Sequence, residues 1–186
     1  VDSRSQVDLT TEFTPGLELD TPLVSAAMDT VTEAELAIAL GEAGGLGTIH
    51  RFLTVEEQAD AVATVADAGV PAAAAVGIDE DHLGRATALV EAGVDAVVVD
   101  VAHGHMERTL AAVADIREAF PEVELVAGNV ATPAGVEDLY AAGADCVKVG
   151  IGPGSHCTTR KVAGAGVPQL TAVDDCADAA ADLDVT

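Results

Sequence analysis

The feature that most constrains the fold is a repeat of about 25 residues that is marked by Ala-Gly pairs. The pairs stand at 43–44, 68–69, 92–93 and 142–143, at spacings of 25, 24 and 50 residues, and Phe120-Pro121 takes the place of the skipped copy. Glycine suits the left-handed position just after a helix. A short apolar run follows most of the pairs, so the repeat predicts alternating helices and strands in a parallel α/β fold.

Six apolar runs are predicted to be strands. They are continuous rather than alternating, as is typical of parallel strands that are covered on both faces. Eight such units would form a TIM (β/α)8 barrel. We therefore predict an incomplete TIM barrel of about six units, as a single partial domain over residues 1–186, with a doubly wound sheet as the alternative. The runs are Leu23–Ala27, Leu46–Ile49, Ala72–Val76, Ala96–Val101, Leu125–Ala127 and Cys146–Val149, and residues 184–186 read as the start of another strand.

Several helix starts are readable between these runs. Thr30 with Glu33, and Thr54 with Glu57, fit the capping box, in which a hydroxyl caps the helix and a carboxylate follows three residues later. Thr132-Pro133 places a capping hydroxyl before a proline at the first helical position. Apolar residues at helical spacing after His105 predict a further helix; they are Met106, Leu110, Val113, Ile116 and Phe120.

The charge of the chain excludes some partners. Acidic residues outnumber basic ones by 32 to 8, which gives a net charge of −24. Such a surface repels nucleic acid and anionic membranes, so we expect neither as a partner. The carboxylates are spread along the chain, which is typical of a cytoplasmic protein of a halophile. No apolar run reaches the roughly 18–20 residues of a transmembrane helix, and three cysteines without a C-x-x-C motif predict no disulfide framework.

The loop after the run Cys146–Val149 carries the clearest chemical signal. It has glycines at 150, 152 and 154, followed by Ser155, His156, Cys157, two threonines and Arg160. In TIM barrels the chemistry lies on loops at the carboxyl ends of the strands. Backbone N–H groups and a serine hydroxyl suit a phosphate, and a cysteine beside cationic side chains is a candidate nucleophile. A glycine-rich turn with an incidental cysteine is the alternative.

The segment Gly150–Arg160 resembles the catalytic loop of the IMP dehydrogenase/GMP reductase family. Other segments resemble the family in the same order along the chain. They are Ser25–Glu33, Gly44–His50, Val98–His105, Ala127–Thr132 and Gly166–Ala172.

This resemblance implies an oxidoreductase that transfers hydride between purine C2 and NAD or NADP while Cys157 holds the nucleotide covalently. It further implies a K⁺ ion bound by the backbone carbonyls of Gly152, Gly154 and Cys157, IMP or GMP as the substrate, and a homotetramer when the protein is full length. The other implied roles are nucleotide packing by Ala26 and Met28, a place near the reacting centre for Asn129, 5′-phosphate binding by Ser155, nicotinamide-ribose contact by Asp100, and placement of the leaving group or water by Thr159.

Purely structural roles are the alternatives for several of these residues. Met28 also suits a core position, Asp100 an ordinary carboxylate at a strand end, and Asn129 a backbone cap. Cys146 is interpreted as a small core residue, and Cys176 carries no catalytic signal. The histidines at 50, 103 and 105 match no usual zinc spacing and are interpreted as structural.

The chain departs from the family pattern in three ways. Position 156 is His, where the family usually has Ile or Val. The predicted helix Val55–Ala68 runs directly into the next strand, without the CBS modules that IMP dehydrogenases usually insert there. The sequence stops before the Asp-Gly-Gly motif and the flap, so this polypeptide alone is expected to be inactive. We favour IMP oxidation by NAD over GMP reduction by NADPH to IMP and ammonia, and a non-catalytic nucleotide-binding fragment is the hypothesis of another class.

Overall fold

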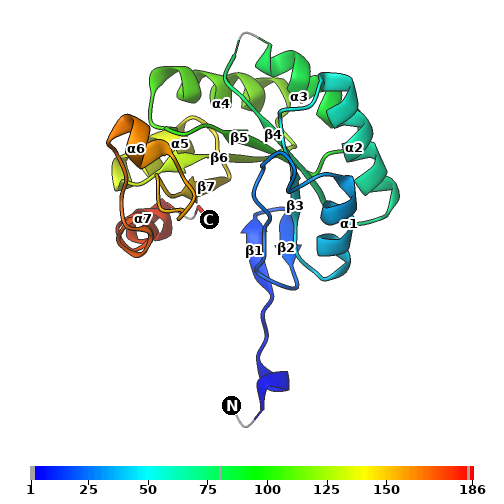
Figure 1. Cartoon of the computed structure of the whole chain (residues 1–186), viewed down its shortest axis with the longest axis horizontal. Coiled ribbons are helices and arrows are strands. Elements are labelled where there is room, and N and C mark those ends of the chain that lie inside the picture. Colours follow the sequence, from blue (N-terminus) through cyan, green and yellow to red (C-terminus); the bar gives the residue numbers. More distant parts are fainter. Residues whose placement is uncertain (1–2, 80, 184) are drawn as a thin grey trace.

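The computed structural model describes residues 3–79, 81–183 and 185–186, and its main element is one parallel sheet (Figure 1). The strands lie side by side in the order in which they occur along the chain, and neighbouring strands are parallel. A doubly wound sheet would reverse its strand order at a switch point. The strands are β3 (Gly47–Ile49), β4 (Ala72–Val76), β5 (Ala96–Asp100), β6 (Glu124–Val130) and β7 (Cys146–Val149).

In the part of the chain that the structure describes, helices cover the outer face of the sheet (Figure 1). Strand side chains on that face, such as Ile49, Val97 and Leu125, are fully buried in one cluster with residues of the helices. The helices are η1 (Arg4–Gln6), α1 (Ala34–Glu42), α2 (Val55–Asp67), α3 (His82–Glu91), α4 (Glu107–Ala119), α5 (Pro133–Ala141), α6 (Thr159–Ala163) and α7 (Gln169–Leu183).

The inner face of the sheet has a separate apolar cluster. A hairpin of β1 (Thr11–Thr14) and β2 (Leu17–Leu19) supplies Phe13, Leu17 and Leu19 to it. Leu46, which precedes β3, also belongs to this cluster, and the strands supply Ala73, Ala96, Val98, Val126 and Cys146. Because doubly wound sheets carry helices on both faces, this arrangement contradicts that alternative. The prediction of an incomplete TIM barrel is confirmed.

The predicted strands differ from the observed ones mainly at their ends. Ala72–Val76 and Cys146–Val149 have the predicted bounds, whereas β6 is longer than the predicted run. Leu23–Ala27 forms a single parallel bridge between Val24 and Leu46 instead of a full strand. It lies at the edge of the described sheet, so only one neighbour offers it hydrogen bonds. At the other edge the Val147 N–H donates to the Thr186 carbonyl at 2.8 Å, which fits a strand that starts there; Asp184 lies outside the described residues.

The sequence repeat has two structural causes. First, the glycine of every Ala-Gly pair has a positive φ, as expected after a helix; the angles are +81° at Gly44, +74° at Gly69, +90° at Gly93 and +110° at Gly143. Second, the aspartate of the two closest copies binds the preceding strand. Asp95 accepts from the Ala72 N–H, and Asp145 accepts from the Leu125 N–H, both at 2.8 Å. Each aspartate therefore ties its own βα unit to a neighbouring one.

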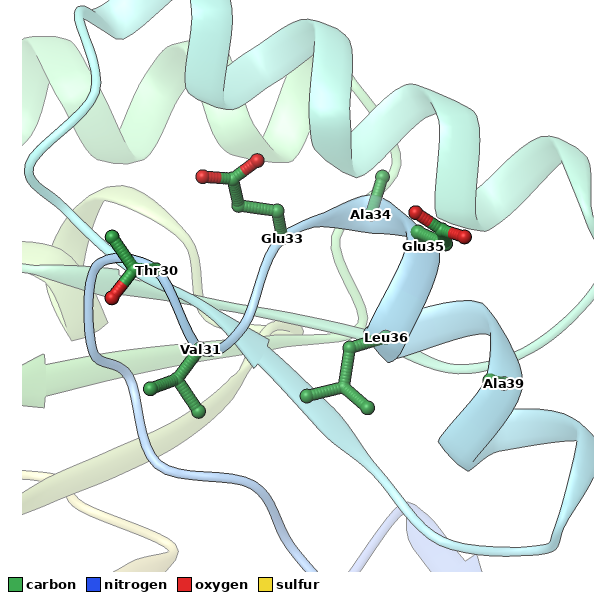
Figure 2. Close-up of a pocket in the computed structure, with 7 residues that line it drawn as sticks. All are labelled: Thr30, Val31, Glu33, Ala34, Glu35, Leu36 and Ala39. Atoms are coloured by element: carbon green, nitrogen blue, oxygen red, sulfur yellow. The ribbon is translucent and has the colours of Figure 1, made fainter.

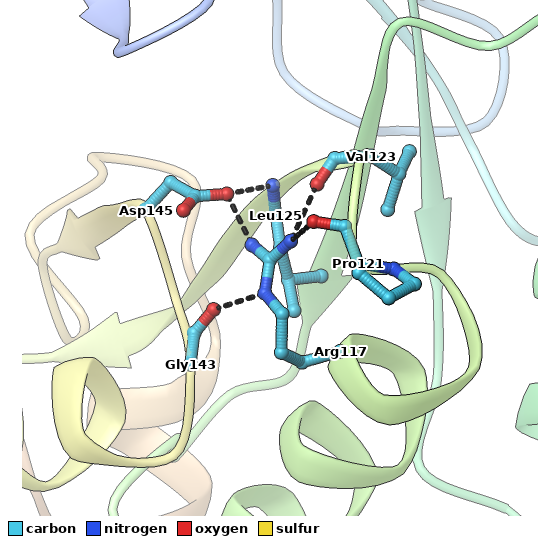
Figure 3. Close-up of polar contacts among 6 residues, drawn as sticks. All are labelled: Arg117, Pro121, Val123, Leu125, Gly143 and Asp145. Carbon is cyan, nitrogen blue, oxygen red and sulfur yellow. Dashed lines mark hydrogen bonds and ion pairs between the residues drawn. The ribbon is translucent and has the colours of Figure 1, made fainter.

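Arg117 extends the second of these ties into a clamp (Figure 3). Its Nε donates to the Gly143 carbonyl at 3.0 Å, and its Nη1 donates to the carbonyls of Pro121 and Val123, each at 2.9 Å. Its Nη2 pairs with Asp145. The clamp thus joins the end of α4, the start of β6 and the turn before β7, the strand that leads into the cysteine loop.

Two of the predicted helix starts are confirmed and one is wrong. Thr54 and Glu57 form both hydrogen bonds of a capping box at α2, and the Thr132 hydroxyl accepts from the Gly135 N–H before α5. Thr30 caps no helix, because α1 begins at Ala34 with Glu33 as its N-cap. The buried Thr32 hydroxyl donates to the Ala26 carbonyl at 2.7 Å instead. This bond holds residues 28–32 in a turn, with Thr30 at a φ of +58°.

Candidate active site

Cavities follow one another along the carboxyl ends of the strands. An inner cavity of about 360 Å³ lies against Ala26 and Val98. A mouth cavity of about 350 Å³ lies above it, and the two share Ala27, Asp100 and Lys148 as lining residues. An outer cavity of about 460 Å³ shares Ala102 with the mouth cavity and reaches Thr159. The three form a continuous belt across the end of the partial barrel where TIM-barrel chemistry is located.

The belt brings together four residues that the sequence singled out. Ala26 lines the inner cavity, and Met28, Asp100 and Asn129 line the mouth cavity. The Met28 side chain is 54% exposed, so it is not a core residue. The Oδ1 atom of Asn129 is buried without a hydrogen-bond partner among the described residues. An unsatisfied buried acceptor is costly, and a ligand that donates to it would remove that cost.

Lys148 is a site residue that the sequence reasoning missed. Its Nζ donates to Asp100 Oδ1 at 2.9 Å, across the inner and mouth cavities that both residues line. This pairing fixes Asp100 at the end of β5 and neutralises its charge. The available signal was a lysine inside an otherwise apolar strand, because the side chain of such a residue must reach a polar partner or solvent.

The cysteine loop joins β7 to the short helix α6. Cys157 is partly exposed, and its N–H donates to the Gly154 carbonyl at 3.2 Å. The Thr159 hydroxyl and then the Thr159 backbone N–H bind the sulfur and hold the pKa of the Cys157 thiol below its ordinary value, with a smaller contribution from Arg160. The thiolate is the nucleophilic form. By contrast, Cys146 is buried in the inner apolar cluster, which confirms it as a core residue, and this burial raises the pKa of its thiol to about 12.

The residues of this loop lie apart from the mouth cavity. Thr159 lines the outer cavity, and Gly152 lines a neighbouring cavity of about 350 Å³ that shares Gly166 and Val167 with it. Ser155 and His156 are exposed to solvent. The belt therefore ends beside the cysteine loop, while Met28, Asp100 and Asn129 line the mouth cavity.

The Gly154 carbonyl is already engaged in this structure. It accepts from the Cys157 N–H and also from Arg160 Nη2 at 3.1 Å. A carbonyl oxygen has two lone pairs, so these two donors occupy both of them. One of the donors is the positively charged Arg160 guanidinium. The loop as it stands therefore does not offer Gly154 to a potassium ion.

The largest of these cavities lies elsewhere (Figure 2). It measures about 580 Å³ and lies against the start of α1, where Glu33 and Glu35 contribute carboxylates and no basic residue takes part. Negative charge repels an anionic nucleotide. The belt, with Arg51 and Lys148 in its lining, is the better candidate site.

His50 and His105 contact other residues of the protein, and His103 lines the outer cavity. His50 is buried, and its Nδ1 accepts from the Phe52 N–H at 3.2 Å. His105 pairs with Asp138 at 2.7 Å. No group of three or more His, Cys, Asp or Glu residues in the described ranges is placed to hold a metal ion. Within the same ranges no helix has the length and apolar character needed to span a membrane.

The sequence matches one known protein family over nearly its whole length. The family model for the IMP dehydrogenase / GMP reductase domain matches residues 2–186. The chain belongs to this family. The IMP dehydrogenase of Nitrosopumilus maritimus is 33% identical to it over 301 residues, which cover 95% of this chain. The corresponding protein of Aquifex aeolicus is 34% identical over 308 residues and covers 97%, and that of Borreliella burgdorferi is 37% identical over 225 residues and covers 94%.

The chain spans less than two thirds of the length of those relatives. It spans 63% of the length of the Nitrosopumilus and Aquifex proteins and 56% of the Borreliella protein. The match with the Nitrosopumilus protein extends over 301 residues, although this chain has 186, so the relative carries a long internal segment without a counterpart here. In this structure α2 is followed by β4 after only a short turn.

Proposed function

We propose that this protein oxidises IMP to XMP with NAD⁺ as the hydride acceptor and Cys157 as the nucleophile. The observation that carries the proposal is the belt of cavities, which joins Met28, Asp100 and Asn129 to the loop that holds a cysteine of lowered thiol pKa. The relatives named IMP dehydrogenase favour this direction over GMP reduction.

The chemistry follows from the residues. The Cys157 thiolate forms a bond to purine C2, and the hydride on C2 leaves for the nicotinamide, which supplies the redox step when it is bound. Water then adds to C2, the carbon–sulfur bond breaks, and Cys157 is released as the thiol. The sum is IMP, NAD⁺ and water giving XMP, NADH and a proton. Thr159 lowers the thiol pKa at the start, and we also assign it the placement of the water.

The remaining roles fit the same site. Ala26 and Met28 offer exposed apolar surface to the nucleotide, Asn129 accepts a hydrogen bond from it, and Ser155 holds its 5′-phosphate. Asp100, fixed by Lys148, accepts from hydroxyls of the nicotinamide ribose. We further propose a cytoplasmic, halophilic homotetramer that uses K⁺. Binding of K⁺ by the carbonyls of Gly152, Gly154 and Cys157 requires Arg160 to release Gly154 first.

The decisive assay uses the intact natural protein in molar KCl. IMP with NAD⁺ is followed by NADH absorbance, and GMP with NADPH is followed by ammonia release. We expect the protein to turn over IMP with NAD⁺ but not GMP with NADPH. The activity should be lost in Cys157→Ser and retained in Cys176→Ala, because Cys176 is buried in α7. Replacing K⁺ by Na⁺ at equal ionic strength is expected to lower the rate. Turnover of GMP alone would reverse the assigned direction, and turnover by Cys157→Ser would contradict the nucleophile.

A further inference from the structure

One basic side chain at the mouth cavity has no polar partner in the described protein. Lys148, Arg85 and Arg108 each donate to a protein oxygen, as do Arg117 and Arg160. Arg51 lines the mouth cavity but has no hydrogen bond or ion pair with any described residue. In a chain with 32 acidic residues and 8 basic ones, an arginine left unpaired beside a cavity calls for a ligand as its partner.

The position of Arg51 is fixed by its neighbours. Its guanidinium carbon lies 5.4 Å from the centre of the Phe52 ring, a cation–π contact. The Phe52 N–H donates to the buried ring of His50 directly after β3, and this bond orders the loop. Stacking on an aromatic ring holds a guanidinium in place without using its five N–H donors. Arg51 is therefore preorganised to bind an acceptor-rich anion.

The rest of the cavity wall narrows the class of ligand. Phe52 is 65% exposed, so the wall beside Arg51 offers apolar surface to a flat group. The carboxylate of Asp29 in the same lining suits ribose hydroxyls. Lys148 is already neutralised by Asp100, so Arg51 is the free cationic group of this lining. A nucleotide supplies a planar ring, N–H and O–H donors, and a phosphate.

The distance to the cysteine loop separates two phosphate positions. Arg51 follows β3, whereas Ser155 follows β7, four strands away in the sheet. At about 4.8 Å between neighbouring strands, the two loops are roughly 19 Å apart along the curve of the sheet. Ser155 is not among the residues that line the mouth cavity with Arg51. If Ser155 holds the phosphate of the mononucleotide, then Arg51 faces a different one.

We propose that Arg51, held on Phe52, binds the pyrophosphate of the dinucleotide cofactor at the mouth cavity. The proposal rests on the proposed function, because it takes the ligand to be NAD⁺. It adds a cofactor-binding residue that contributes to affinity for NAD⁺ and leaves affinity for IMP unchanged.

The test is calorimetric titration of the intact natural protein in molar KCl with NAD⁺ and, separately, with IMP. A hydrogen bond to a charged group contributes roughly 1.5–3 kcal/mol, so Arg51→Ala is expected to weaken NAD⁺ binding about 10- to 100-fold. Arg51→Lys keeps the charge and should recover part of this loss. IMP affinity should stay the same in both variants. The matched control is Arg4→Ala, which removes an equal charge from the exposed η1 helix.

The outcomes separate this proposal from the proposed function. Inorganic pyrophosphate should compete with NAD⁺ for the natural protein and no longer compete for Arg51→Ala. Unchanged NAD⁺ affinity in Arg51→Ala, with IMP turnover retained, would overturn the role of Arg51 alone. Weakened IMP binding with normal NAD⁺ binding would also overturn it, because Arg51 would then hold the mononucleotide. A natural protein that binds neither ligand would overturn both proposals. If Arg51→Ala loses its circular-dichroism signal, the comparison of Arg51→Lys with Arg4→Ala decides.

Discussion

Arg117→Met should destabilise the protein by about 3 kcal/mol, because it opens the clamp that holds β6 and β7 together. The substitution keeps most of the alkyl stem and removes every donor of the guanidinium. It leaves the carbonyls of Gly143, Pro121 and Val123 without their donor, and Asp145 without its ion-pair partner. Arg117 and Asp145 are 24% and 27% exposed, so water replaces part of the loss.

The magnitude follows from these contacts. Each of the three carbonyl bonds contributes about 0.5–1 kcal/mol after that replacement, and a partly exposed ion pair contributes up to about 1 kcal/mol. The assay is urea unfolding in molar KCl. With a slope of about 2 kcal/mol per molar urea, the midpoint should fall by about 1.5 M with an unchanged slope. Arg108→Met is the control, since exposed Arg108 donates a single bond to the Ile78 carbonyl. A loss no larger than that of the control would refute the clamp.

Three further predictions concern single groups and salt. Thr159→Val should raise the Cys157 thiol pKa toward its ordinary value, because it removes the hydroxyl that lowers it. The thiolate forms above the pKa, so the pH profile of iodoacetamide alkylation should move to higher pH, and an unmoved profile would contradict the assignment. Thr54→Ala should lower the free energy of unfolding by about 1 kcal/mol, because it removes the capping box of α2. An unchanged urea midpoint would argue against that cap. Dilution from about 1 M to 0.1 M KCl lengthens the screening distance from about 3 to 10 Å, so a chain of net charge −24 should melt at a lower temperature. A melting temperature indifferent to KCl would speak against halophily.

Much of the fold was readable because it depends on local signals that the repeat multiplies. The Ala-Gly pairs predicted helix ends, and each of their glycines has the expected positive φ. Thr54 and Thr132 predicted helix starts for the same local reason. Thr30 misled the prediction, because the buried hydroxyl of Thr32 binds the Ala26 carbonyl six residues earlier and the helix begins later. A contact of this kind within a loop leaves no periodic trace in a sequence.

The sequence likewise predicted some residues of the candidate site and missed others. The cysteine loop was found because its glycines, serine and cysteine stand together in the sequence, and Met28, Asp100 and Asn129 were found through resemblance. Lys148 and Arg51 were missed, because their roles depend on which residues lie near them in the folded protein. Lys148 on β7 reaches Asp100 on β5, and Arg51 lines a cavity without a polar partner among the described residues. Pairing and its absence are properties of the folded chain.

Peptide mass spectrometry after a single turnover tests most directly whether Cys157 is the nucleophile. The intact natural protein is mixed with IMP and NAD⁺, quenched in acid within the first seconds, digested and mapped. We expect a purine nucleotide, with its C2 hydride removed, bound to the peptide that contains Cys157, and we expect this adduct to require NAD⁺. Formation of XMP while the nucleotide is attached to another residue, or to none, would exclude Cys157 as the nucleophile.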